Sequence, residues 1–98
     1  MELKEFQNEC LKLIPKYLTR GDEALIGLMG LNSGSGAVLK RYKKTLYDNH
    51  ELDTNGFTDE LAYILCYLAI TAHAIDCDLE TVMERCVEKI RDAGDQKN

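Results

Sequence analysis

The chain has 98 residues, of which 45 % are hydrophobic and 30 % are charged, and its formal net charge is −5. This length fits one domain, residues 1–98, and the balance of apolar and charged residues excludes an intrinsically disordered chain. The acidic charge argues against nucleic acid as a partner, because nucleic-acid binding usually needs a basic field.

A helix is predicted at the start of the chain. Its apolar residues recur in steps of three and four, which places them on one side of a helix. They are Leu3, Phe6, Cys10, Leu13 and Tyr17. Pro15 removes a backbone donor and clashes with the preceding turn, so a kink or a helix end is expected near Ile14. Residues 20–22 have the composition of a turn, with Asp22 as the expected N-cap of a second helix.

The second predicted helix carries Gly27 and Gly30 on one side, where small residues let another helix approach closely. Residues 32–36 read Asn-Ser-Gly-Ser-Gly, which disfavours an uninterrupted helix, so a break is predicted before a third helical segment that starts near Val38. A glycine-rich loop can bind anions through backbone N–H groups, but this run matches no phosphate-loop motif and follows no strand. A simple connection between helices is the preferred interpretation.

Residues 47–57 form the main predicted loop, and Thr58 is the expected cap of the next helix. Thirteen of the fifteen residues from Leu61 to Ile75 are hydrophobic, a run shorter than the roughly 20 residues of a membrane span. A buried helix is therefore predicted, and no membrane is expected as a partner. Because one small chain has few elements to cover such a helix, packing in a homodimer or homotetramer is expected.

The last predicted helix begins after Asp78 and ends near Gly94. Its apolar stripe consists of Leu79, Val82, Met83, Cys86, Val87 and Ile90. The opposite side carries Glu80, Glu84 and Glu88, for which a solvated face is the preferred interpretation.

The four cysteines form no CxxC pair and no zinc-like spacing with histidine. They are Cys10, Cys66, Cys77 and Cys86. Three of them occupy apolar helical positions, so free thiols are preferred to disulfides. Free thiols, together with a start that has no basic region before an apolar run, predict a cytoplasmic protein without a signal peptide.

Other polar groups give weak signals of chemistry. The basic run at residues 40–44 can contact phosphates, but a solvated helix face is preferred. His50, a predicted loop residue, and His73, a predicted helix residue with satisfied hydrogen bonds, are isolated, so no catalytic triad is indicated. Asp59 and Glu60 are adjacent, but no two carboxylates three residues apart face another such pair.

Several segments, in order along nearly the whole chain, resemble one enzyme family. They are Phe6-Gln7, residues 30–38, residues 47–53, residues 59–69, residues 78–82 and residues 88–91. Residues 59–69, for example, are similar to the motif Glu-Glu-Leu-Gly-Asp-Val-Leu-Trp-Tyr-Leu-Ala of the MazG-like nucleoside triphosphate pyrophosphohydrolases. The resemblance implies an all-α fold of four to five helices in a MazG-like bundle that dimerisation completes.

The resemblance also locates the positions at which that family holds magnesium with four carboxylates. These positions are Gly34, Ala37, Glu60 and Tyr63 in this sequence, so Glu60 is the only remaining family ligand. A single carboxylate cannot assemble a cage for Mg²⁺, which takes about six oxygen ligands. The prediction is therefore a catalytically impaired or inactive MazG-like protein, with no catalytic residue and no cofactor.

Two roles remain open for such a protein. It binds a nucleotide or another anion, with Lys44, Lys89, Gly34 and Gly36 as the candidate binding residues, or it acts as an oligomeric regulatory or interaction module. In a purely structural form of the module, Tyr63 and its neighbours fill the former pocket.

The alternative is an active magnesium-dependent enzyme that converts a nucleoside triphosphate to a monophosphate and pyrophosphate. That enzyme would need carboxylates from the loop, such as Asp48, Glu51 or Asp53.

Overall fold

The computed structural model describes residues 1–48 and 51–97. The regular secondary structure of these residues is helical, with α1 (Leu3–Leu11), α2 (Arg20–Tyr47), α3 (Thr54–Ala74) and α4 (Leu79–Lys97), and they contain no strand. The predicted all-α fold is thus confirmed. The prediction for His50 lies outside the described residues.

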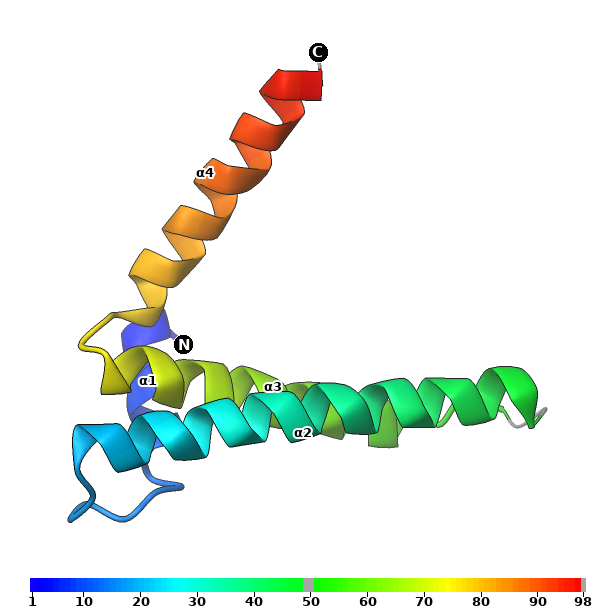
Figure 1. Cartoon of the computed structure of the whole chain (residues 1–98), viewed down its shortest axis with the longest axis horizontal. Coiled ribbons are helices and arrows are strands. Elements are labelled where there is room, and N and C mark those ends of the chain that lie inside the picture. Colours follow the sequence, from blue (N-terminus) through cyan, green and yellow to red (C-terminus); the bar gives the residue numbers. More distant parts are fainter. Residues whose placement is uncertain (49–50, 98) are drawn as a thin grey trace.

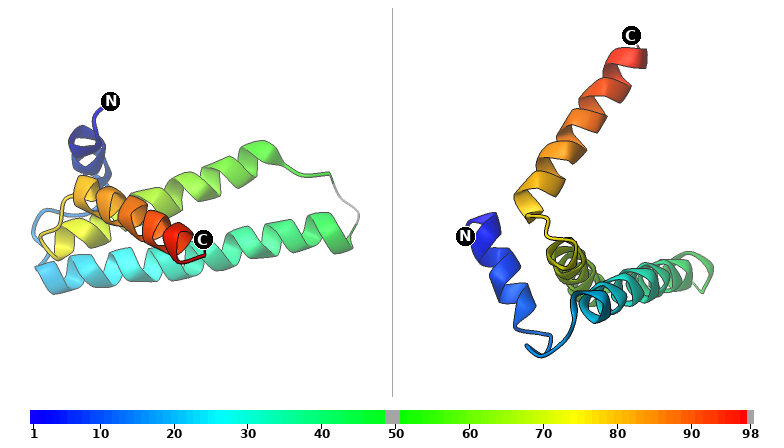
Figure 2. Two further views of the ribbon diagram at one scale, coloured as in Figure 1. Left: turned by 90° about the horizontal axis from the view of Figure 1, so that it is seen from above. Right: turned by 60° about the vertical axis from the view of Figure 1, so that its left-hand side comes forward.

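The helices form an L-shaped arrangement (Figure 1). α2 and α3 lie side by side as a long antiparallel hairpin, and α1 packs against α3 near the end of the hairpin where α2 begins (Figure 2). α4 rises away from the hairpin, at 106° to α3. The radius of gyration is 16.1 Å, against about 12.6 Å expected for a compact chain of this length.

The hydrophobic core lies where α1, α3 and the start of α4 meet. Its buried apolar residues are Cys10, Ala69, Ile70 and Leu79. Leu3 and Phe6 pack against them, so the first three residues of the predicted stripe face this core, whereas Leu13 and Tyr17 lie beyond α1 and are exposed. Beyond Leu11, backbone N–H groups as far as Ile14 donate to the carbonyl three residues earlier. Ile14 precedes Pro15, so the helical part ends close to the predicted position.

α2 is one continuous helix, so the predicted break at residues 32–36 is wrong. Three glycines let α2 and α3 approach so closely that a Cβ atom on any of them would collide with an α3 side chain. The pairs are Gly27 with Thr71, Gly30 with Tyr67, and Gly34 with Ile64. A helical glycine costs about 1 kcal/mol relative to alanine, and the close packing between the two helices offsets this cost.

The predicted helix caps also need correction. Thr19, not Asp22, caps α2, because its Oγ1 accepts a hydrogen bond from the backbone N–H of Asp22 at 3.1 Å. Asp53, not Thr58, caps α3 by accepting from the backbone N–H of Gly56 at 3.0 Å. α4 continues past Gly94 to Lys97.

Candidate functional site

The four positions that correspond to the family's metal ligands do not converge on one site. Ala37 and Glu60 line a small recess of about 240 Å³ between α2 and α3. Tyr63 lines a different cavity, of about 700 Å³, between α1 and α3. Gly34 lies against Ile64 in the contact between α2 and α3.

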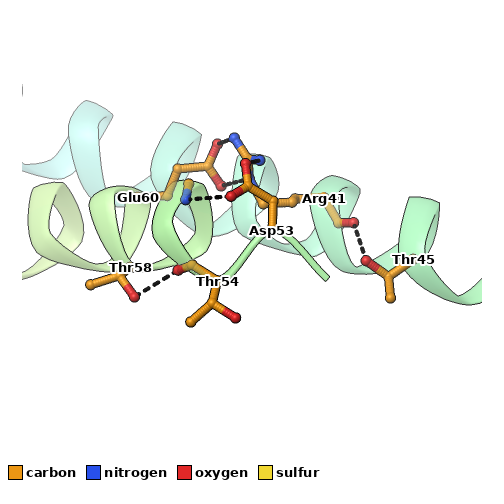
Figure 3. Close-up of polar contacts among 7 residues, drawn as sticks. Arg41, Thr45, Asp53, Thr54, Thr58 and Glu60 are labelled. Carbon is orange, nitrogen blue, oxygen red and sulfur yellow. Dashed lines mark hydrogen bonds and ion pairs between the residues drawn. The ribbon is translucent and has the colours of Figure 1, made fainter. Parts of the chain in front are cut away.

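Arg41 lines the recess together with Glu60 and binds its carboxylate (Figure 3). Its Nε and Nη2 donate to the two carboxylate oxygens of Glu60, each at 3.1 Å, and its Nη1 donates to Oδ2 of Asp53 at 3.1 Å. The hydrogen bonds to Glu60 raise the pKa of Arg41 above its ordinary value. One guanidinium therefore ties α2 both to the side of α3 and to the cap of α3.

This arrangement does not fit Mg²⁺. Both oxygens of Glu60 already accept charge-assisted hydrogen bonds, which a metal ion would have to displace. Asp53, one of the candidate loop carboxylates, is bound to the same guanidinium. No group of three or more His, Cys, Asp or Glu side chains suited to a metal occurs in residues 1–48 and 51–97. The residues thus form an ion-pair clasp, hereafter the Arg41 clasp.

The predicted anion-binding residues are dispersed. Lys44 lines the recess, together with Lys40 and Arg41. Lys89 lies on α4, which projects away from the hairpin, and is not among the residues that line this recess. Gly34 and Gly36 lie in the interior of α2, where backbone N–H groups are used in helical hydrogen bonds. Residues 32–36 therefore do not form an open loop that could supply free backbone donors to an anion.

A second polar cluster joins the start of α2 to the end of α3. Arg20 donates to the backbone carbonyl of His73 at 3.1 Å and pairs with Asp76 at 3.2 Å. Glu23, which is largely buried, lies 3.5 Å from Nε2 of His73. His73 is therefore a partnered helix residue, as predicted. Sequence reasoning missed the rest of the cluster, because 53 positions separate Arg20 from His73 and no motif links them.

All four cysteines are free, in agreement with the prediction, but their environments differ. Cys10 is buried in the core, and burial, reinforced by neighbouring Cys66, raises the pKa of its thiol to about 12. Cys86, which the α4 stripe predicted to be buried, is exposed.

Comparisons with known proteins leave the chain without an assigned family. No protein-family model matches it, and no curated protein or solved structure shows significant similarity to it. Within the described residues, no single helix combines the length and apolar character needed to cross a membrane. α3 and α4 have both only when taken together, and this pair is bent by 106°.

Proposed function

We propose that this chain is a MazG-like helical protein without pyrophosphohydrolase activity, which acts as a homo-oligomeric interaction module. The Arg41 clasp is the observation that carries the proposal. Metal-dependent hydrolysis needs a divalent ion that polarises the phosphate and activates water. In this chain the one carboxylate at a family metal position has both oxygens engaged by a guanidinium.

Apolar surface supports the assembly part of the proposal. Large hydrophobic side chains are exposed along α2, α3 and α4, and not only as scattered single residues. The four free thiols suit the reducing cytoplasm, which is the compartment proposed for this module.

A hydrolysis assay tests the catalytic part. The purified chain is incubated with each common ribo- and deoxyribonucleoside triphosphate and Mg²⁺ or Mn²⁺, and released pyrophosphate is measured. No turnover above a protein-free control is expected for the wild-type chain or for Glu60→Ala. Turnover that Glu60→Ala abolishes would establish the active enzyme instead, whereas turnover that survives this substitution would indicate a mechanism unlike that of the family.

A second candidate function is the binding of a nucleotide or another phosphate-bearing anion at the recess. Lys40 and Lys44 line it, and neither forms an ion pair with a carboxylate among the described residues. Arg41 adds positive charge to the same wall, although Glu60 and Asp53 already neutralise it. The two lysines are therefore the groups available to an anion.

Calorimetric titration with pyrophosphate and with ATP, in the absence of metal, tests this second function. Replacing both Lys40 and Lys44 by alanine should weaken binding at least about tenfold, a loss typical of charge-assisted contacts. Lys43→Ala is the matched control, because Lys43 is a neighbouring lysine of α2 that does not line the recess. Equal losses in the control and the double variant would indicate nonspecific attraction.

A further inference from the structure

Six large apolar side chains of the α2–α3 hairpin are between 46 and 57 % exposed. They are Leu28, Leu39, Tyr42 and Leu46 of α2, and Leu61 and Leu65 of α3. With half-buried Leu31 and Leu68 they recur at helical spacing, and Ser35 fills the one polar position of the α2 stripe. These eight apolar residues are called the hairpin face.

Both stripes of the hairpin face lie on the same side of the hairpin. Stripe residues come one position after residues that pack against the opposite helix, as Leu28 follows Gly27 and Leu65 follows Ile64. One position corresponds to a rotation of about 100°. α2 and α3 run antiparallel (Figure 2). The same rotation in each helix therefore points to the same side.

The rest of the chain covers a different side and meets the hairpin face only at Leu68, which packs against the core. Cys66 and Ile70, which belong to the core with α1, come one position before Tyr67 and Thr71, the residues of α3 that pack against α2. They are therefore rotated in the opposite sense, and α1 lies across the hairpin from the face. α4 also starts on the side of α1, since Leu79 packs into the same core.

The solvent-accessible surface area of the single chain is larger than that expected of a compact monomer. The chain exposes 7603 Å², whereas a compact monomer of 11.1 kDa exposes about 5,700 Å², so the excess is about 1,900 Å². Exposed apolar side chains of the hairpin and of the projecting α4 contribute to this area. Obligate homodimers bury about 1,000–2,500 Å² on each partner, which is the same range.

We infer that the hairpin face binds the same face of a second copy of this chain, so that two hairpins form a four-helix arrangement. The inference rests on the proposed homo-oligomeric function and specifies its surface. None of the eight residues carries a charge, and large apolar interfaces are typical of obligate homodimers. A face that binds its own copy closes as a two-fold dimer, and antiparallel hairpins pack well in this way.

Light scattering after size-exclusion chromatography tests the inference on the full chain. The wild-type protein should have a mass of about 22 kDa, twice the 11.1 kDa of one chain. The double variant Leu39→Glu with Leu65→Glu should weaken dimerisation at least about 100-fold, because it places two charges in an apolar interface. Met29→Glu is the matched control and should leave the mass unchanged, because Met29 is an exposed apolar residue of α2 that is rotated by about 100° from Leu28, away from the stripe.

Two further measurements keep the outcome decisive. The melting temperature of the wild-type chain should rise with protein concentration, as dimer formation requires, and this result does not depend on whether a variant folds. Ile90→Glu should leave the dimer intact, because Ile90 is an exposed residue of α4 and lies outside the hairpin face.

The possible failures are distinguishable. A wild-type monomer with a concentration-independent melting temperature would overturn both the homo-oligomeric function and the inference. A dimer that survives the double hairpin variant, or that Ile90→Glu dissociates, would overturn only the assignment to the hairpin face.

Discussion

Gln7 is a buried polar residue that links α1, α3 and α4. Its Nε2 donates to the backbone carbonyls of Ala69 at 3.1 Å and Cys77 at 3.2 Å, and its Oε1 accepts from the backbone N–H of Leu79 at 3.2 Å. The side chain thereby fixes the turn between α3 and α4 and satisfies one of the free N–H groups at the start of α4. A buried glutamine that makes all these bonds helps to hold α4 in its projecting direction.

Replacing Gln7 with leucine should lower the free energy of unfolding by about 2–4 kcal/mol, because the substitution removes three hydrogen bonds and leaves a buried N–H unpaired. Urea denaturation followed by circular dichroism measures this change. Gln96→Leu, the same substitution at an exposed position near the end of α4, should change stability by less than about 0.5 kcal/mol. Equal effects at the two positions would contradict the role assigned to Gln7.

Cys10 should be the least reactive thiol of the folded chain. Its pKa is raised from 9.0 to about 12, so at pH 8 it holds about 1,000-fold less thiolate than an ordinary cysteine. Iodoacetamide labelling of the native protein, read by mass spectrometry, should modify Cys86 long before Cys10. Similar labelling rates at the two residues would show that Cys10 is not buried in solution.

The same shift has a consequence for stability. Because folding raises the pKa of Cys10, its stabilising contribution is complete below pH 9 and is lost as the pH rises toward about 12. Unfolding curves between pH 8 and 11 should therefore show decreasing stability, and this part of the decrease should be smaller in Cys10→Ala.

At the scale of elements, apolar periodicity predicted the helices well, whereas the low helix propensity of residues 32–36 wrongly predicted a break in α2. The stripes of α1 and α4 and the apolar α3 follow from local spacing, which the sequence displays directly. Residues 32–36 have low helix propensity, but they are helical because Gly30 and Gly34 lie against α3. These two contacts join residues 37 and 30 positions apart, so local propensity could not reveal them. Both predicted caps were wrong because each helix start offers two good N-cap residues. They are Thr19 and Asp22 for α2, and Asp53 and Thr58 for α3.

Glycine-to-alanine substitutions along α2 should have opposite effects at two positions. Gly36 faces open space, so Gly36→Ala should stabilise the chain by about 0.5–1 kcal/mol through helix propensity. At Gly30 a new Cβ collides with the ring of Tyr67, so Gly30→Ala should destabilise the chain by about 1–3 kcal/mol. Thermal unfolding of both variants measures the contrast. Stabilisation by both would mean that α2 and α3 are farther apart than described.

The candidate site was only partly predictable. The resemblance to the MazG-like family singled out Glu60 from residue identities alone, and its assignment to a metal position of that family stays a prediction. The pairing of Glu60 with Arg41 was not predicted, because Arg41 belongs to a basic run for which a solvated face was the preferred interpretation. Pairing across 19 positions depends on the register between α2 and α3, and the glycine contacts set that register.

At the scale of the whole molecule, stabilising contacts lie along the α2–α3 hairpin and where α1 and the start of α4 join it. The apolar core and Gln7 join α1, α3 and the first turn of α4, while the Arg41 clasp fastens the other half of the hairpin. Beyond Val82, α4 has no residue in the core and its apolar side chains are exposed. The distal part of α4 therefore contributes little to the stability of the single chain.

Removal of residues 87–98 tests this division of the molecule. The shortened chain should unfold with a free energy within about 1 kcal/mol of the full chain, a change of less than about 8 °C in melting temperature. Leu79→Ala, at the buried start of the same helix, should instead cost about 2–5 kcal/mol, because it opens a cavity in the core. If dimerisation uses the hairpin face, the shortened chain should also keep twice its monomer mass in light scattering. A monomeric or strongly destabilised product would show that distal α4 packs against another surface in solution, and the α4 stripe would then replace the hairpin face as the assembly surface.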